Sequence, residues 1–180
     1  TFSRQPVINT TPFIVEYAGS THFSSFWRIR RVSDNVTVYD TTGTFTNGDT
    51  GNLTSFTVPV STLDFDTAYY IQVKFRDNNG LESAYSAAVN FTTPLVDQPE
   101  IQVITPAFNP TINVDPIAMK GGYSHSSSDW QFSPANTFAT IIHQSLGNST
   151  NLNSYTLPNA VNLSSNTTYY VRIRFNINPT

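Results

Sequence analysis

The stretch "SHSSSDWQFSP", residues 124 to 134, brings together the residue types of a hydrolase active site. A histidine that takes a proton from a serine, and is oriented by a carboxylate, turns that serine into a nucleophile. On one extended strand, however, His125, Ser127 and Asp129 would share a face, and the residues between them would lie on the other face. Such a row does not converge on one point, so the spacing argues against catalysis.

An earlier stretch, "THFSSFWRIR" at residues 21 to 30, repeats this pattern without the acid. His22 aligns with His125 and Trp27 with Trp130, whereas Phe26 stands where the later copy has Asp129. We interpret the serines as groups that satisfy backbone atoms where the chain enters a core strand. The histidine would pack over the bend and the tryptophan would fill the core. We therefore expect no catalytic residue and no enzyme.

Aspartates near turns are a second candidate site, because carboxylates at loop ends bind calcium. They are Asp34, Asp40, Asp64, Asp66 and Asp77. Their spacing matches no calcium-loop motif, and the later copy has Ser or Asn in place of Asp64 and Asp66. Solvated turn aspartates are the favoured interpretation, and we expect neither a metal nor a cofactor.

A third candidate is a surface rich in cations and tyrosines. Six of the nine Lys and Arg fall on outward strand positions, where two tyrosines join them: Arg28, Arg30, Tyr70, Lys74, Arg76, Tyr170, Arg172 and Arg174. On a flat sheet these side chains could stack on sugar rings or receive a neighbouring subunit. The alternative is an ordinary solvated sheet whose side chains shield one another across strands.

The elements that position these residues are strands. Alternation of apolar and polar residues runs through most of the chain of 180 residues, and long helical periodicity is absent. The net charge of -3 gives no reason to expect nucleic acid as a partner, and no apolar run is long enough for membrane insertion. With no cysteine, the chain forms no disulfide.

The chain also repeats itself. "TAYYIQVKFRD" starts at residue 67 and "TTYYVRIRFNI" at residue 167, with Tyr69, Ile71, Val73 and Phe75 predicted on the inward face of the first. Upstream, "SFTVPV" aligns with "SYTLPN", and "QPVI" at 5 to 8 resembles "QPEI" at 98 to 101. A repeat of this length suits tandem sandwich domains. We predict domains over 5–94 and 98–180, joined by the short linker "TTPLVDQPE".

The pattern of the first domain predicts seven strands, near 6–9, 12–18, 26–32, 36–41, 53–59, 67–76 and 86–93. The second domain repeats this map but stops after its sixth strand, so we expect its last strand to be missing here. "TFSRQP" at the start resembles "NFTTPLVDQP" at 90–99, a strand ending followed by a linker. We therefore expect this chain to be an internal segment of a longer protein.

"LDFDTAYYIQVKFRDNNGLESAYSAAVNFTT" resembles the last third of a fibronectin type III domain, and "LSSNTTYYVRIRF" stands in the same place in the second copy. The resemblance implies all-β, Greek-key, immunoglobulin-like β-sandwiches, with a tyrosine corner at Tyr69 and Tyr169. One departure is the tryptophan, which falls where the third strand should start, in the immunoglobulin manner.

Such modules occur in phage virion proteins and in bacterial surface or secreted proteins. We expect a non-enzymatic structural module of a virion protein (tail, fibre or decoration), acting as a spacer and contact surface. Its partners would be other copies, neighbouring structural proteins or cell-surface glycans, at the virion or extracellular surface. The alternatives are accessory domains of a secreted polysaccharide-degrading enzyme and a bacterial adhesin stalk.

Overall fold

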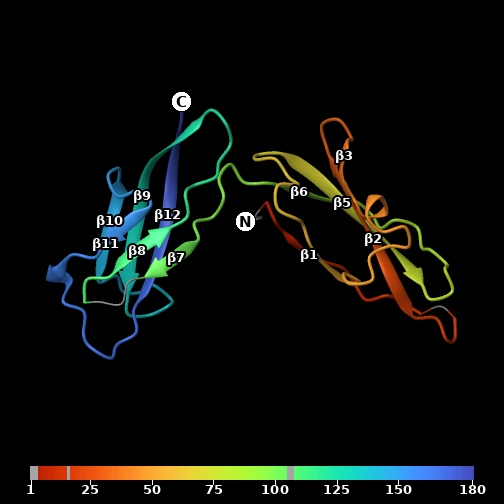
Figure 1. Cartoon of the computed structure of the whole chain (residues 1–180), viewed down its shortest axis with the longest axis horizontal. Coiled ribbons are helices and arrows are strands. Elements are labelled where there is room, and N and C mark those ends of the chain that lie inside the picture. The colour runs from red at the N-terminus through yellow and green to blue at the C-terminus, as the bar shows by residue number, and fades with distance from the viewer. Residues whose placement is uncertain (1–3, 16, 105–107) are drawn as a thin grey trace. The chain divides into compact units, whose positions relative to one another are not determined.

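A computed structural model describes residues 4–15, 17–104 and 108–180 of the chain. Backbone contacts divide the chain into two compact units, Thr1–Leu95 (unit 1) and Val96–Thr180 (unit 2). Both units are built from antiparallel strands (Figure 1), and the described residues of each unit include one short 3-10 helix. Across the described residues, no helix is long and apolar enough to cross a membrane.

Unit 1 holds two sheets. Its elements are β1 (Val7–Asn9), β2 (His22–Arg31), β3 (Thr37–Asp40), η1 (Thr41–Gly43), β4 (Ser55–Thr57), β5 (Ala68–Asp77) and β6 (Val89–Thr92). One sheet pairs β1 with β4, and the other has the order β3-β2-β5-β6. The chain changes sheet between β1 and β2, between β3 and β4, and between β4 and β5, as a Greek-key sandwich requires.

Unit 2 has the same plan. Its elements are β7 (Ile101–Ile104), β8 (Thr111–Val114), β9 (Tyr123–Ser133), β10 (His143–Asn148), β11 (Ser154–Thr156), η2 (Asn159–Val161) and β12 (Tyr170–Pro179). The sheets have the orders β11-β8-β7 and β10-β9-β12. β9 corresponds to β2 and β12 to β5, but among the strands of the described residues β12 pairs with β9 alone.

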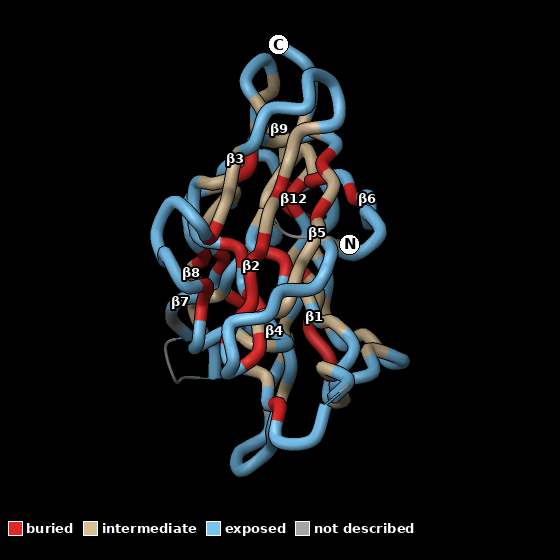
Figure 2. The backbone as a smooth tube through the Cα atoms, turned by 90° about the vertical axis from the view of Figure 1, so that its right-hand side faces the viewer, coloured by how far each residue is buried: buried red, intermediate tan, exposed pale blue. Residues whose placement is uncertain are grey.

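Each unit closes its two sheets over its own core. In unit 1, Trp27 and Tyr69 from one sheet pack with Phe56 from the other. In unit 2, Trp130 and Phe175 pack with Tyr155 in the same way. Figure 2 shows buried residues along β2, the central strand of its sheet. The tryptophans therefore fill the two cores, as the sequence predicted.

The expected strand map is wrong at the start of unit 1. β1 was expected to be the first strand of the sandwich, but it pairs with β4 as β8 pairs with β11. The carbonyl of Pro6 accepts a hydrogen bond from Val58 N–H at 3.1 Å, and Pro110 does the same with Leu157 at 3.0 Å. "QPVI" therefore corresponds to the segment around Pro110, not to "QPEI".

The strand expected near 12–18 is absent from the described residues of that range, and residues 1–3 of the "TFSRQP" resemblance lie outside the described part. A proline and turn residues bound the 12–18 segment, and no strand of the described residues pairs with its described part. In this segment Phe13 stacks on His22, with ring centroids 5.1 Å apart.

Candidate functional site

The histidine and serine of "SHSSSDWQF" do meet in space, although not as a catalytic pair. Nε2 of His125 lies 2.9 Å from Oγ of Ser128. That hydroxyl donates its hydrogen to the carbonyl oxygen of Leu152 at 2.7 Å. The ring of His125 stands edge-on to Phe175, with centroids 4.7 Å apart. The indole N–H of Trp130 completes the cluster by donating to the carbonyl of Asn151 at 2.9 Å.

Unit 1 repeats the cluster group by group. Nε2 of His22 lies 3.0 Å from Oγ of Ser25, which donates to the carbonyl of Leu53. The indole of Trp27 donates to Asn52 at 2.8 Å, and His22 stands edge-on to Phe75 at 4.6 Å. Because both units contain this cluster, we attribute it to the sandwich fold that they share.

The direction of the hydrogen bonds in this arrangement argues against activation of the serine as a nucleophile. A serine hydroxyl has one hydrogen, and in both units that hydrogen points to a backbone carbonyl. Ser128 therefore accepts from the N–H of His125, whereas a general base must accept from the serine. Burial lowers the pKa of His22 and of His125, and a hydrogen bond to the backbone of Ser24 or Ser127 only partly offsets this effect.

A β-bulge brings the histidine to the serine. Asn176 is in register with Ser127 and Ile177 with His125, so Ser126 is the extra residue in β9. β2 has the same irregularity between His22 and Ser24. A bulge turns the strand by one residue and moves the preceding side chain to the other face. The expectation that His125 shares a face with Ser127 and Asp129 is therefore wrong.

Asp129 lies on the opposite, outer face of β9. Its carboxylate accepts hydrogen bonds from Arg174 at 2.5 and 3.0 Å, from Gly147 N–H at 2.7 Å and from Asn176 at 3.1 Å. Burial acts to raise its pKa, but these hydrogen bonds outweigh burial and hold the pKa below its ordinary value. The acid thus belongs to an ion pair in which the carboxylate is buried and Arg174 is exposed, and the strand separates it from the histidine.

Sequence reasoning missed the loops that receive this cluster. Asp49 pairs with Ser25 in an isolated bridge, and its carboxylate accepts from Gly51 and Asn52 N–H at 2.9 and 3.0 Å. Asn148 does the same for unit 2, where it accepts from Asn151 N–H at 2.7 Å. The shared signal was "DTGNL" against "NSTNL", an Asp or Asn followed three residues later by Asn-Leu.

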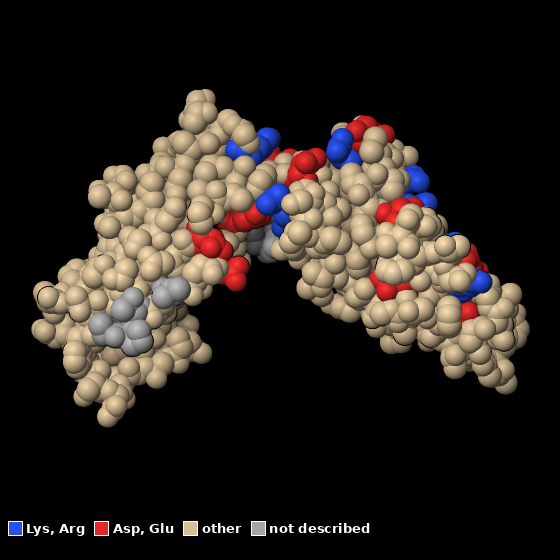
Figure 3. Space-filling view, in the orientation of Figure 1, with Lys and Arg blue, Asp and Glu red and all other residues tan. Residues whose placement is uncertain are grey.

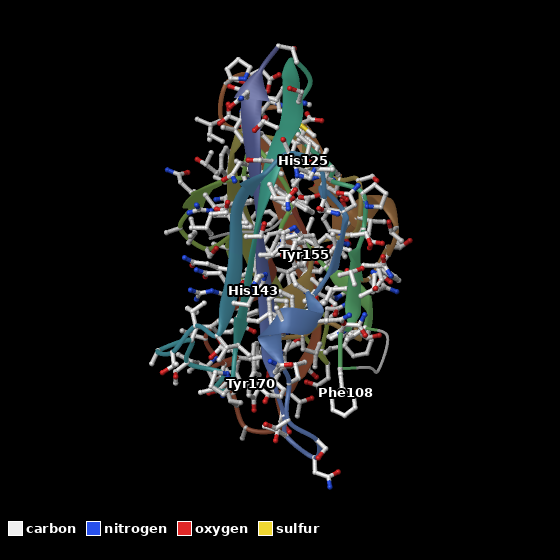
Figure 4. The ribbon with its side chains drawn as sticks, turned by 90° about the vertical axis from the view of Figure 1, so that its left-hand side faces the viewer. Phe108, His125, His143, Tyr155 and Tyr170 are labelled. Carbon is white, nitrogen blue, oxygen red and sulfur yellow. The ribbon has the colours of Figure 1, made fainter. Side chains whose placement is uncertain are left out.

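His143 was also missed. Its Nε2 lies 2.7 Å from the hydroxyl of Tyr155, and both rings pack on Phe132. Figure 4 shows His143 and Tyr155 together, away from His125. In unit 1 the equivalent pair is Tyr39 and Phe56, with ring centroids 4.9 Å apart. The alignment of "SFTVPV" with "SYTLPN" matches Phe56 with Tyr155, but no alignment matched Tyr39 with His143.

Three of the turn aspartates hold local structure. Asp34 pairs with Arg31 at 2.9 Å, Asp40 accepts from Thr42 N–H at 2.8 Å, and Asp64 lies 3.4 Å from Arg31. Among the described residues, no group of three or more His, Cys, Asp or Glu side chains could hold a metal ion.

The expectation that the turn aspartates are solvated is wrong for Asp77, which is buried. Its carboxylate accepts from Leu81 N–H at 2.7 Å, Asn79 N–H at 2.9 Å and Ser20 at 2.9 Å, and it thereby organises the hairpin after β5. Burial favours the neutral acid, but these hydrogen bonds outweigh it and lower the pKa. Only the folded hairpin assembles these donors around one carboxylate.

The outer face of β2 and β5 is partly covered by the segment after β5. Arg28 lies over the ring of Tyr85, with its guanidinium carbon 3.9 Å from the centroid. Lys74 lies 4.5 Å from the centroid of the Phe26 ring and forms an ion pair with Glu82 at 2.5 Å. These cations are half-buried, and their contacts are made within unit 1.

The other nominated side chains of unit 1 have partners on the same face. Arg30 lies 3.5 Å from the side-chain oxygen of Asn35, which also accepts from the hydroxyl of Tyr70. Arg76 donates to Asn47 at 2.9 Å. The five nominated residues of unit 1 therefore lie on one face. Their contacts there are with neighbouring side chains and with the loops that cross the sheet.

The three nominated residues of unit 2 are more open to solvent. Tyr170 is 38% exposed and the side chain of Arg174 is 77% exposed. Arg172 donates to Gln131 at 2.8 Å and lies over the ring of Phe138, 4.4 Å from its centroid. In Figure 3 most of the visible surface is neither acidic nor basic.

Tyr69 and Tyr169 occupy equivalent positions in the two units, and the hydrogen bonds of their hydroxyl groups identify the fold. The hydroxyl of Tyr69 accepts from Asp64 N–H at 2.9 Å, and that of Tyr169 accepts from Ser164 N–H at 3.1 Å. A tyrosine that bonds back to the backbone a few residues upstream is a tyrosine corner. The fold is a tandem pair of fibronectin type III-like β-sandwiches. The expected tyrosine corners are both confirmed.

No family model and no curated protein matches the chain. Among solved structures, the chain is similar to the FN1–FN3 domains of chicken CNTN1, with a TM-score of 0.40 and 15% sequence identity. The match covers 97% of this chain and 55% of that one, so this chain spans about half the length of that structure.

Proposed function

We propose that this chain is a non-enzymatic structural and interaction segment of a larger virion protein, of the tail, fibre or decoration kind. Its two sandwiches serve as a spacer and offer their surface to neighbouring proteins or cell-surface glycans. The observation that carries the proposal is the duplicated cluster of His, Ser and Trp. The residues best suited to chemistry lie where the chain enters a core strand in both units. The hydrogen bonds that the two serines donate end on backbone carbonyls.

The composition supports a place on a particle or an extracellular surface. Charged residues make up 12% of the chain, cysteine is absent, and Thr, Asn and Ser provide most of the polar surface. A surface of short neutral side chains loses little side-chain entropy when it packs against a neighbour. The exposed group Tyr170, Arg172 and Arg174 supplies the aromatic and guanidinium side chains that are enriched at protein interfaces.

An antiserum against the chain tests the location. Labelling of intact particles from the source organism, seen by immuno-electron microscopy, is the expected result. Label confined to the bacterial cell surface would replace the virion proposal by the adhesin stalk. Label that follows a polysaccharide-degrading activity in the medium would replace it by the accessory domain of an enzyme.

Variants of the exposed group test the contact surface. Replacing Tyr170 and Arg174 by Ala together removes an exposed ring and a guanidinium group that is largely exposed. We expect weaker binding of the chain to dissociated particle proteins or to a glycan array. The matched control replaces Tyr70 and Arg76, whose contacts lie within unit 1. Equal binding by the wild type and the unit 2 variant contradicts a contact role for this surface.

A further inference from the structure

A row of polar side chains crosses the outer face of one sheet in unit 2. Gln144 of β10, Gln131 of β9 and Arg172 of β12 are cross-strand neighbours in this row. Nε2 of Gln131 donates to Oε1 of Gln144 at 3.0 Å, and Nε of Arg172 donates to Oε1 of Gln131 at 2.8 Å. These hydrogen bonds direct the guanidinium of Arg172 from β12 toward β9.

The loop after β9 holds the same guanidinium from another side. Its carbon lies 4.4 Å from the centroid of the Phe138 ring. The backbone of Phe138 has a φ of +54°, which is an outlier for a bulky side chain. Strain of this kind persists only where the surroundings enforce it, and it is concentrated at ligand clamps and other functional sites. A strained loop thus places a ring against a guanidinium whose Nε is already bound.

Unit 1 contains the same pair of residue types with the two strands exchanged. Arg28 of β2, the counterpart of Gln131, donates to Oε1 of Gln72 at 2.8 Å. Gln72 of β5 is in turn the counterpart of Arg172. Arg28 is half-buried and lies over the ring of Tyr85, whereas Arg172 is exposed. The exchange therefore moves the guanidinium from a covered position to one that a ligand can reach.

The charge of Arg172 is not balanced within the described part of unit 2. Arg174, the neighbouring cation, is paired with the carboxylate of Asp129. Among the described residues, Arg172 has no ion pair, and its two Nη groups have no hydrogen-bond partner. Free Nη groups form a planar fork of donors that matches a carboxylate. Because the ring and the amide already hold this fork, binding costs little side-chain entropy.

We propose that Arg172, Tyr170 and Gln144 bind an acidic sugar, that is, a sugar residue that carries a carboxylate. The inference rests on the contact role proposed above for the exposed group of unit 2, and it names the ligand. The Nη groups of Arg172 bind the carboxylate. The exposed ring of Tyr170, about 7 Å away on the same face of β12, stacks on the sugar ring. Nε2 of Gln144, which has no partner among the described residues, donates to a hydroxyl group of the adjoining sugar.

The distribution of polar groups on this face favours a sugar over a neighbouring protein. Around the row, β9 and β12 present Asp129, Gln131 and Arg174 at the centre of the face. The exposed apolar side chain of Leu146 lies at its β10 edge. A protein interface has an apolar core and a polar rim, which is the reverse of this arrangement. Amide and guanidinium groups at the centre instead suit the hydroxyl and carboxyl groups of a sugar.

An NMR titration of the isotope-labelled chain with a tetrasaccharide that alternates glucuronic acid and N-acetylglucosamine tests the proposal. We expect saturable shifts of the Nε–H signal of Arg172 and of the side-chain amide signal of Gln144. The side-chain amide of Gln72 in unit 1 is an internal control and should not shift. The matched ligand is the same tetrasaccharide with its carboxyl groups reduced to alcohols. It should bind at least about tenfold more weakly, because it cannot form the charge-assisted hydrogen bonds.

Three variants test the residues. Arg172→Lys keeps the charge but removes the planar fork, so we expect at least about tenfold weaker binding. Phe138→Gly removes the ring that holds the guanidinium, and because Gly adopts a positive φ without strain, the loop keeps its path while binding weakens. Arg76→Gln is the matched control, since it removes a cation from unit 1 and should leave the affinity unchanged. Backbone amide signals of unit 2 verify that each variant is folded.

Absence of shifts with the acidic tetrasaccharide overturns the proposal. Equal binding of the reduced tetrasaccharide, or unchanged binding by Arg172→Lys, overturns recognition of the carboxylate. Equal affinity for acetate shows that the sugar ring adds nothing and overturns the acidic sugar as ligand. The wider contact role fails separately. If the double variant of Tyr170 and Arg174 loses binding to particle proteins while the tetrasaccharide does not bind the wild type, the contact role stands and the acidic sugar is overturned.

Discussion

At the scale of single residues, Ser25 and Ser128 connect each histidine to the backbone. Each hydroxyl is fully buried and satisfies one carbonyl, that of Leu53 or Leu152, while it accepts from the ring of the histidine. A buried group that loses its partner keeps the full penalty of its lost hydration. The pair is therefore a structural joint between the central strand and the loop that faces it.

We expect Ser128→Ala to lower the free energy of unfolding of unit 2 by about 1–3 kcal/mol, because it leaves the Leu152 carbonyl and the His125 N–H unpaired. Ser25→Ala should have the same effect on unit 1. Urea unfolding measures both. The exposed Ser124→Ala in the same strand is the control and should stay within about 0.5 kcal/mol of the wild type. Equal stability of the Ser124 and Ser128 variants would contradict this role of the hydroxyl.

The histidines also predict a pH dependence. Burial lowers the pKa of His22, His125 and His143 below the ordinary value of 6.5, so between the two values the unfolded state binds more protons than the folded state. Stability is then complete above pH 6.5 and falls as the pH drops below it. Thermal unfolding over that range measures the effect. His125→Gln should reduce the dependence of the unfolding temperature of unit 2 on pH. If the variant leaves this dependence unchanged, the role of His125 in it is contradicted.

At the scale of elements, the bulges in β2 and β9 decide on which face of the strand each histidine lies. Each bulge rotates the histidine onto the core side, and the loop that follows packs against the opposite face. Gly48 shows how closely that loop approaches β2. A side chain there would meet Oγ of Ser24 at 2.6 Å and its Cβ at 2.9 Å, and the backbone of Gly48 has a φ of +85°.

Gly48→Ala should therefore destabilise unit 1 by about 1–3 kcal/mol, through the left-handed backbone and through overpacking against Ser24. Gly43→Ala is the matched control in the same unit, because a side chain at Gly43 meets no atom within 4 Å and the backbone there is not left-handed. Urea unfolding of the two variants makes the comparison. Similar stabilities for both would show that the loop can move away from β2.

At the scale of the whole molecule, the two units share a plan but not the same degree of closure. β5 is covered on both sides, whereas β12 is covered on one, so apolar side chains of unit 2 that have buried counterparts in unit 1 remain in contact with water. Burial of apolar area stabilises a fold by about 25 cal/mol per Å², and the area that stays exposed in unit 2 does not contribute this stabilisation. The two cores are separate clusters of buried residues.

We expect unit 2 to unfold at a lower urea concentration than unit 1. Amide signals assigned to each unit, followed by NMR through a urea titration, resolve the two transitions in one sample. A single transition common to both units would show that they stabilise each other. Earlier unfolding of unit 1 would show that the free side of β12 has little effect on stability.

The sequence by itself determined the strands, the repeat, the two buried tryptophans and the tyrosine corners at Tyr69 and Tyr169. These features follow from local alternation and from comparing two copies of one pattern, which needs no knowledge of contacts. It also argued correctly that Asp129 has no counterpart in the first copy. It failed at residues 6–18, where a short match of four residues suggested the wrong equivalence.

Only the tertiary structure decided which groups meet. The bulge that brings His125 to Ser128 changes the face of a side chain by a register shift, and such a shift leaves no mark on the pattern of residue types. The cover of Tyr85 over Arg28 and the pairing of Asp129 with Arg174 join residues far apart in the chain. Spacing predicts what one strand presents, but the loops and strands that pack on it decide what each side chain binds.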